Sequence, residues 1–336
     1  MQFRTEIDIK KSGISLPHSE EVVLLGSCFA DNMGEKLKSS KFHVLCNPFG
    51  VLYNPMSIAW QIERSLNQQH FTAESEELFQ DTEVYHSWMH HTSFSASSAT
   101  EITEKINVAL DETYNALKTA KTLIITFGTA IIYQLKHDGR LVANCHKQND
   151  NMFTRRMLSV DEITKRWTGV CLKLHSLNPG LQVIFTVSPV RHKRDGFHAN
   201  QLSKATLLLA VEHTLESLGD TLKADYFPSY EIMMDELRDY RFYADVMIHP
   251  SSTAVEYIWE RFADTYISDE DMKIIKSCID IKNGLSHRAN NPASESYLQF
   301  LTTINHNIIE LKNKCPYLDM ESELELCNTL LMKSQA

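Results

Sequence analysis

The chain has 336 residues, of which 43% are hydrophobic and 23% are charged, and this composition excludes a disordered or fibrous protein. Its formal net charge of −10 argues against a nucleic-acid-binding protein, because phosphate binding needs a basic surface. The chain has no GxGxxG and no GxxxxGK[ST] motif, so the sequence indicates neither a dinucleotide site nor a P-loop.

The N-terminal segment and the cysteines bear on where the protein works. Residues 1–16, MQFRTEIDIKKSGISL, mix acids and bases where a secretory signal needs an apolar run, and no later window has the length of a membrane span. The seven cysteines are odd in number and contain no CxxC pair, which is typical of reduced thiols and not of disulfides or a zinc site. We therefore expect a cytoplasmic protein that binds no membrane.

Apolar runs of strand length alternate with helical patterns along the first part of the chain. Val22–Lys38 is predicted as a strand, a turn at Gly26 and a helix, and a short strand is predicted before Asn47. Thr122–Phe127 and Gln182–Val187 are apolar and end in turn-prone segments, which is typical of buried parallel strands. The predicted helices are Ile58–Asn67, Thr100–Ala120, Ser159–Leu177, His198–Leu218 and Ser252–Tyr266.

This alternation predicts an α/β domain over residues 1–265, a three-layer α/β/α sandwich with a central parallel sheet. From about Asp269 onward the pattern is helical, with breaks at Pro292 and Pro316, so residues 266–336 are predicted to form a helical C-terminal extension. Its apolar residues recur at helical spacing and need a partner. The extension is therefore a candidate surface for homo-oligomer formation.

Small and polar residues follow each predicted strand, and the carboxyl ends of parallel strands are where such folds bind ligands. The segments are Gly26-Ser27-Cys28-Phe29-Ala30, Asn47-Pro48-Phe49-Gly50, Gly128-Thr129 and Ser188-Pro189-Val190-Arg191-His192. A later segment, DVMIHPS at 245–251, precedes the last predicted helix of the domain and can bring His249 over the same edge. We predict that the active centre lies on the first strand-turn-helix and is completed by His249.

Six segments together resemble the GSCFA-domain family. They are GSCFA at 26–30, NPFGVLYNP at 47–55, FGTA at 127–130, VANCHK at 142–147, SPVRH at 188–192 and YFPSYEIMMDELRDYRFYADVMIHPS at 226–251. That family is similar to the SGNH/GDSL hydrolases. In those enzymes a Gly-Asp-Ser turn supplies the nucleophile, a later Gly and Asn help to form the oxyanion hole, and Asp-x-x-His supplies the base. The resemblance implies an SGNH-like fold and catalytic layout, and says less about the substrate.

The nucleophile that the resemblance implies depends on the register of the first motif. With the glycines aligned, Cys28 takes the nucleophile position, and a shift by one residue places Ser27 there instead. A cysteine at a helix N-terminus has its pKa lowered by the helix dipole and acts beside a histidine without a third residue, so Cys28 ranks slightly ahead. Such a thiol is expected to react below the pH at which a free thiol ionises. The alternative is a turn in which the thiol is only packed.

His249 is the implied base for either nucleophile, but the expected carboxylate is displaced. Val246 stands three positions before His249, where the SGNH pattern has Asp, and the nearest acid is Asp245, four positions before. Whether Asp245 reaches the imidazole stays open. Pro250 and Ser251 also suit the start of a helix, a structural role that is compatible with catalysis.

The resemblance also implies an oxyanion hole and a substrate-binding set. Either Thr129 stands where the SGNH pattern has Asn, or that side chain is supplied from elsewhere, so we expect the hole to use backbone N–H groups near Cys28 and Gly50 together with a side chain such as Thr129. Arg and Lys orient carboxylate or phosphate oxygens, which suits an anionic or hydroxyl-rich substrate, whereas solvated loops with ordinary ion pairs are the alternative. The expected substrate-binding residues are Asn47, Gly128, Asn144, His146, Lys147, Arg191 and His192.

Three histidines raise the question of a metal. His86 and His90 lie four residues apart, a spacing with which a helix can bind a metal ion, and His91 follows directly. No HExxH glutamate and no evident third ligand accompany them. We therefore predict no metal and no tightly held cofactor.

These features favour an acyl-ester hydrolase or acyltransferase that acts on a small substrate, carbohydrate-derived or a cell-envelope precursor. Cys28 or Ser27 would attack an ester or thioester carbonyl, His249 would move the proton, and water or a sugar hydroxyl would resolve the acyl-enzyme. Acetyl-CoA is a candidate acyl donor, because basic residues near Arg191 suit its phosphates. The rival is a non-catalytic ligand-binding or scaffold protein on the same fold.

Overall fold

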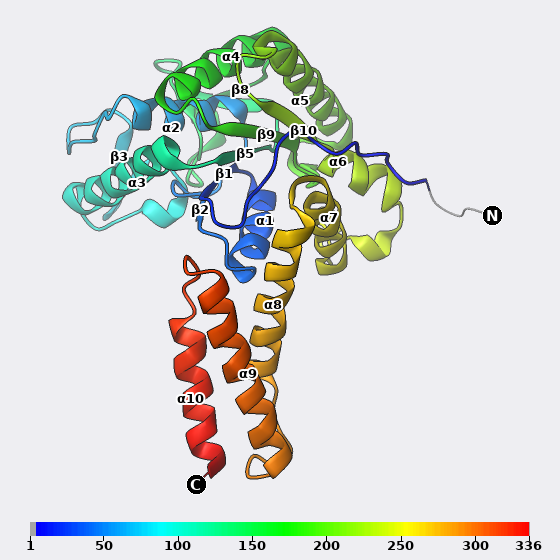
Figure 1. Cartoon of the computed structure of the whole chain (residues 1–336). Helices are drawn as coiled ribbons and strands as arrows, with labels where there is room; N and C mark the ends of the chain where they lie inside the picture. The colour runs from blue at the N-terminus through cyan, green and yellow to red at the C-terminus, as the bar shows by residue number, and fades with distance from the viewer. Residues whose placement is uncertain (1–4, 336) are drawn as a thin grey trace. The chain divides into compact units, whose positions relative to one another are not determined.

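The computed structural model describes residues 5–335, which form two units (Figure 1). The first unit contains residues 5–14, 21–34 and 44–266 of the described chain. Its centre is a five-stranded sheet in which every neighbouring pair is parallel. The spatial order is β10 (Ala224–Phe227), β9 (Gln182–Val187), β5 (Thr122–Phe127), β1 (Val22–Gly26) and β2 (Val44–Cys46). The predicted strands β1, β5 and β9 are adjacent, and their side chains are buried throughout, as expected for a sheet covered on both faces.

Helices cover both faces of this sheet (Figure 1). One face carries α2 (Pro55–Leu66), α3 (Ala99–Thr119), α4 (Val160–Leu177) and α5 (Phe197–Leu218), and the other carries α1 (Cys28–Ser39) and α7 (Ser252–Tyr266). Val23 of β1 and Trp167 of α4 belong to the same core. On the opposite face Phe227 of β10 packs against Phe262 of α7, with ring centroids 5.2 Å apart. The three-layer α/β/α sandwich is confirmed.

Two small antiparallel sheets were not predicted, and several short helical turns accompany them. The sheets are β3 (Leu78–Asp81) with β4 (Val84–Ser87), and β7 (Leu141–Val142), β6 (Ile131–Leu135) and β8 (Phe153–Met157) in that order. The short turns are η1 (Thr92–Phe94), η2 (Asp150–Met152), η3 (Lys193–Asp195), α6 (Ser229–Glu231), the π-helical η4 (Ile232–Glu236) and η5 (Tyr240–Phe242). Their sequences are short or polar, so they lack the apolar periodicity on which prediction rests.

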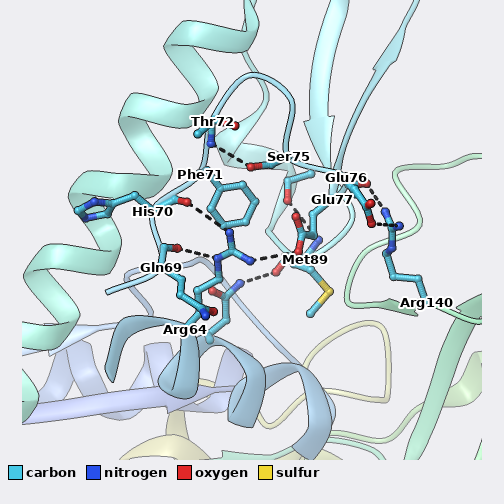
Figure 2. Close-up of polar contacts among 12 residues, drawn as sticks. Arg64, Gln69, His70, Phe71, Thr72, Ser75, Glu76, Glu77, Met89 and Arg140 are labelled. Atoms are coloured by element: carbon cyan, nitrogen blue, oxygen red, sulfur yellow. Dashed lines mark hydrogen bonds and ion pairs between the residues drawn. The ribbon is translucent and has the colours of Figure 1, made fainter. Parts of the chain in front are cut away.

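The β3–β4 hairpin is fastened to α2 by the network in Figure 2. The guanidinium of Arg64 pairs with Glu77 at 3.1 Å and lies over the ring of Phe71, 4.1 Å from its centroid. Gln61, also on α2, donates to the carbonyl oxygen of Met89 at 2.6 Å. Because Met89 lies two residues after the end of β4, these bonds fix the start of the loop that leads to His91, a residue of the cleft described below.

The second unit contains residues 15–20, 35–43 and 267–335 of the described chain. Its helices are α8 (Asp269–Ser286), α9 (Glu295–Lys314) and α10 (Glu321–Gln335), so the predicted helical C-terminal region is confirmed. Pro292 precedes α9, and Pro316 separates α9 from α10. The helices share a core that includes Ile281, Ile308 and Cys327. Within residues 5–335, no helix combines the length and apolarity needed to cross a membrane.

Candidate active site

A cleft of about 530 Å³ opens at the carboxyl ends of the parallel strands. Its walls come from the turn after β1, the loops after β2, β5 and β9, the β7–η2 loop and the loop before α7. Cys28, Thr129, Arg191, His192 and His249 all line it. These six segments lie far apart in the sequence and meet here, as expected for the carboxyl ends of a parallel sheet.

The turn after β1 directs its two candidate nucleophiles differently. Gly26 has φ +143°, and a Cβ there would lie 2.2 Å from the carbonyl oxygen of Thr126, so only glycine fits. Ser27 is 1% exposed, and its Oγ accepts a hydrogen bond from the N–H of Phe29 at 3.3 Å. Cys28 is half-buried and lines the cleft at the first residue of α1. The thiol is thus accessible from the cleft, whereas the hydroxyl of Ser27 is buried as part of the turn.

The protonation of Cys28 differs from the expectation of a depressed pKa. Burial raises the pKa of the Cys28 thiol, and the carboxylate of Asp31 raises it further. The N–H groups of Cys28 and Phe29 and the charge of Lys204 act in the opposite direction without reversing the shift. The N–H groups at the start of the helix therefore favour the thiolate, as predicted, but desolvation outweighs their effect on the pKa.

His249 lies in a closed turn that ends at the start of α7. The N–H of Ala244 donates to the carbonyl oxygen of His249 at 2.8 Å. The N–H of Arg191 donates to the carbonyl oxygen of Ile248 at 2.9 Å. These bonds fix the backbone of His249 beside the loop after β9. The imidazole lines the same cleft as Cys28, although no hydrogen bond joins the two side chains in the described part of the chain. Catalytic hydrogen bonds often form only when substrate is bound.

Asp245 does not act as the missing carboxylate in this structure. Its side chain is exposed, and none of the hydrogen bonds of residues 5–335 links it to His249. The reason is local, because Met247 adopts φ +57° and its N–H donates to the carbonyl oxygen of Ala244 at 2.7 Å. This tight turn leaves Asp245 in solvent.

The two expected oxyanion residues are already engaged. The N–H of Gly50 donates to the carbonyl oxygen of Asn47 at 2.8 Å, and Gly50 does not line the cleft. Thr129 lines the cleft, but its N–H donates to the carbonyl oxygen of Tyr53 at 2.9 Å and its Oγ1 bonds with Ser203 at 3.1 Å. Neither group is free to receive an oxyanion. The N–H of Cys28, at the N-terminus of α1, is a better-placed donor.

Two expected substrate ligands have structural roles instead. Asn47 braces the nucleophile turn, since its Oδ1 accepts from the N–H of Gly26 at 2.8 Å and its Nδ2 donates to Asp31 at 2.6 Å. Gly128 donates its N–H to Tyr53 at 2.8 Å, and neither Asn47 nor Gly128 lines the cleft. Both therefore shape the site from behind.

The remaining expected substrate ligands all line the cleft: Asn144, His146, Lys147, Arg191 and His192. Asn144 is tied to Thr92 at 3.1 Å, and His146 donates through Nε2 to the carbonyl oxygen of Ser87 at 2.7 Å. Arg191 lies over the ring of Phe197 at 4.3 Å. Within residues 5–335 no carboxylate forms an ion pair with Lys147 or Arg191, so both cations remain available to an anionic group.

His192 is a neutral histidine with an unused nitrogen. Its Nε2 is buried and has no hydrogen-bond partner among the described residues. Burial, together with the charges of Lys204 and His249, lowers the pKa of His192 to about 4. The ring stands edge-on to Tyr53, with centroids 5.8 Å apart. This nitrogen faces Gly128, since a Cβ added at that glycine would lie 3.3 Å from it.

The histidines considered as metal ligands do not share a helix. His86 lies in strand β4, and its Nδ1 bonds with Ser95 at 2.6 Å. His90 is fully buried, and its Nδ1 bonds with Ser87 at 2.8 Å. In the part of the chain that the structure describes, no group of three or more His, Cys, Asp or Glu residues is arranged to hold a metal ion.

Sequence reasoning missed Lys204. It lies on α5 and is 1% exposed, and its Nζ donates to the carbonyl oxygens of Gly128 at 2.7 Å and Ser188 at 2.6 Å. Burial lowers the pKa of Lys204 to about 7. The sequence spacing could have indicated that Lys204 is buried, because this residue shares the buried face of α5 with Asn200, Ser203 and Leu207.

These features define an α/β/α sandwich with a ligand cleft at the strand ends and a cysteine at its first strand–helix turn. The chain belongs to the GSCFA family, whose model matches residues 21–262, and the C-terminal domain model of GSCFA domain proteins matches residues 280–333. The family that the motifs resemble is thereby confirmed.

One similar solved structure is an acetyl xylan esterase (Est2A) from the rumen bacterium Butyrivibrio proteoclasticus, with 12% sequence identity and a TM-score of 0.38. The match covers 74% of this chain and 63% of that chain. No curated protein matches this chain.

Proposed function

We propose that the chain is an acyl-ester hydrolase or acyltransferase with Cys28 as nucleophile and His249 as base. The observation that carries the proposal is the opposite placement of the two adjacent candidates. Cys28 lines the cleft together with His249, whereas Ser27 is 1% exposed and caps the turn. The thiol is the group that a substrate in the cleft can reach.

The reaction follows from these positions. His249 takes the proton of Cys28, and Sγ attacks the ester carbonyl carbon to form a tetrahedral intermediate. The N–H of Cys28 donates to the developing oxyanion. The intermediate then expels the alcohol, which receives the proton from His249 and leaves a thioester on Cys28. Water completes hydrolysis, and a sugar hydroxyl completes transfer.

The walls of the cleft favour a substrate or donor that carries a negative group. Lys147 and Arg191 line the cleft without a carboxylate partner in the described chain, while the acids Asp150 and Asp195 are paired with Arg194 and Arg155. Unpaired cations in a cleft attract carboxylate or phosphate groups. The substrate class we propose is an acylated carbohydrate or cell-envelope precursor, with acetyl-CoA as a candidate donor for transfer.

A non-catalytic ligand-binding protein is the second candidate. Two observations favour it: burial and Asp31 raise the pKa of the Cys28 thiol, and Asp245 is exposed and makes no hydrogen bond to His249 in the described chain. Such a protein would bind its ligand in the same cleft without turning it over.

Turnover of p-nitrophenyl acetate and of acetyl-CoA tests the proposal, with and without prior alkylation by iodoacetamide. We expect Cys28→Ala to abolish turnover and Ser27→Ala to reduce it only through the turn. Cys145→Ala is the matched control for alkylation, because Cys145 is also half-buried at the cleft. Full activity in Cys28→Ala would refute the proposal, and binding without turnover in the wild type would establish the second candidate.

A further inference from the structure

Lys204 is a buried cation that has no carboxylate partner among residues 5–335. Its Nζ donates to the carbonyl oxygens of Gly128 and Ser188, which follow β5 and β9. In the described chain no carboxylate forms an ion pair with this ammonium. Lysine is almost never fully buried unless its charge is compensated, and buried lysines with a shifted pKa gather at functional sites. The charge of Lys204 therefore calls for a partner.

The nucleophile turn packs against the same glycine that Lys204 binds. A Cβ added at Gly128 would lie 3.4 Å from the Cβ of Ser27, and the N–H of Ser27 donates to the carbonyl oxygen of Thr126 at 3.1 Å. The ammonium and Ser27, the residue directly before α1, thus contact one short segment at the end of β5. The interaction is mutual, because the charge of Lys204 lowers the pKa of Cys28 and an ionised Cys28 raises that of Lys204.

We propose that Lys204 is the buried counter-charge of Cys28: its ammonium stabilises the thiolate, and its two hydrogen bonds hold the loops after β5 and β9 at the cleft. The inference rests on Cys28 as the nucleophile of the proposed function. A thiolate beside an ammonium is net neutral, so a buried site holds the pair at lower cost than either ion alone. Lys204 acts through Cys28 and is a positioning residue.

Other titratable groups lie near Cys28 and Lys204 on the neighbouring elements. Asp31 on α1 opposes ionisation of Cys28, and the thiolate in turn raises the pKa of Tyr53. Near Lys204 are His192, whose pKa the ammonium lowers, and Tyr230, whose ring centroid lies 5.5 Å from Nζ. Lys204 is the charged side chain among these that favours the thiolate.

The test measures the rate at which iodoacetamide alkylates Cys28 across pH, by mass spectrometry and without substrate. Because the pKa of Lys204 is about 7, its support is present at acidic pH and fades as the pH rises. We expect wild-type Cys28 to react about tenfold faster than Cys28 in Lys204→Met at acidic pH, with little difference at alkaline pH. Lys204→Arg should keep the fast alkylation of Cys28 at both acidic and alkaline pH, because arginine does not lose its charge.

Ser203→Ala is the matched control. Ser203 precedes Lys204 on α5, and its Oγ accepts from the N–H of Ala130 at 2.7 Å, so the variant loosens the same segment without changing charge. Its alkylation profile should follow the wild type. A folded Lys204→Met protein, checked by thermal unfolding, with wild-type rates at acidic pH would overturn the proposal.

A second measurement leaves Lys204 in place and so does not depend on that variant folding. The thiolate is the reactive form, so the logarithm of the rate normally rises with unit slope until the thiol ionises. Loss of the Lys204 charge should lower the slope of the logarithm of the wild-type alkylation rate against pH near pH 7. The same change in slope should persist in His249→Gln. If the change in slope is absent, or disappears with His249, the counter-charge is not Lys204.

The proposed function and this inference can fail separately. Alkylation needs no turnover, so an inactive protein whose Cys28 still responds to Lys204 refutes only the proposed function. An active protein whose Cys28 ignores Lys204 refutes only the inference.

Discussion

The backbone N–H of Arg191 donates to the carbonyl oxygen of Ile248 at 2.9 Å, which ties the loop after β9 to the turn that carries His249. A cation of the cleft wall and the proposed base are thus positioned by one backbone contact. A substrate group that binds Arg191 therefore binds the loop that is hydrogen-bonded to the turn of His249.

Replacing His249 by Gln should remove the base while keeping a side chain of similar size. Because proton transfer by a positioned side chain contributes about 10²- to 10⁴-fold, we expect kcat for ester hydrolysis to fall by at least about 10²-fold. Steady-state kinetics with p-nitrophenyl acetate measure this. His213→Ala, at an exposed position of α5, is the control and should keep wild-type activity. An active His249→Gln enzyme would assign the base elsewhere.

Asp31→Asn should make Cys28 more reactive. The carboxylate of Asp31 raises the pKa of the thiol, so its removal lowers that pKa and increases the thiolate fraction at neutral pH. We expect iodoacetamide to label Cys28 several-fold faster. Glu35→Gln, an exposed charge change one turn further along α1, is the control and should label at the wild-type rate. Slower or unchanged labelling in Asp31→Asn would contradict the expected sign.

Two glycines make a matched pair for stability. Gly26→Ala places a Cβ 2.2 Å from the carbonyl oxygen of Thr126 at φ +143°, and we expect a loss of about 2–3 kcal/mol or more in the free energy of unfolding. Gly169→Ala lies within α4 with no atom within 4 Å of the added Cβ, and should gain about 0.5–1 kcal/mol. Urea unfolding measures the change in the free energy of unfolding for both variants. Equal changes would contradict the close approach of Gly26 to Thr126.

His90 makes the fold sensitive to acid. It is fully buried, and burial lowers its pKa to about 3, whereas the histidine of the unfolded chain has a pKa near the usual 6.5. The folded pKa is the lower one, so this contribution to stability is present above pH 6.5 and is lost as the pH falls toward 3.

His90→Phe removes the titration and keeps a ring between Phe49, Phe71 and Phe94. We expect the variant to lose about 2–4 kcal/mol less than the wild type on going from pH 7 to pH 4. Guanidinium unfolding at the two pH values measures the difference. The same decrease in both proteins would show that other groups carry the acid sensitivity.

Removing the chain from Asp269 onward should reduce solubility more than it alters the chemistry. Within the second unit, Tyr317 packs on the ring of His18 with centroids 5.8 Å apart, and Glu323 pairs with Lys41 at 2.6 Å. Truncation deprives residues 15–20 and 35–43 of these partners. Sedimentation and light scattering of the truncated protein test this, and a fully soluble, fully stable product would contradict it.

The sequence predicts the central elements well where burial alone decides them. β5 and β9 have the predicted bounds, and so does α7, because their apolar patterns are uninterrupted. Strand β8, FTRRM, was missed because a half-exposed strand of five residues with two arginines has no apolar run. Its pairing with β6 is what makes it a strand.

The cleft could be predicted only for residues that the ends of the parallel strands bring together. Cys28, Arg191 and His249 were expected at one edge and do line one cleft, because parallel strands bring their carboxyl ends together. Gly50 was assigned to the oxyanion hole, but its N–H is used by the backbone of its own turn, a bond that no side-chain pattern reveals. Lys204 was missed because its partners are main-chain carbonyls of two distant loops.

Under the proposed function, the burial of Ser27 limits how a serine could replace the cysteine as nucleophile. The Ser27 hydroxyl already caps the turn, so the serine beside Cys28 offers no hydroxyl to the cleft. A hydroxyl nucleophile would have to arise at position 28, and a serine needs a histidine oriented by a carboxylate, a role that the exposed Asp245 does not fill in the described chain. On the proposed mechanism, a serine enzyme would therefore need changes both at residue 28 and in the turn before His249.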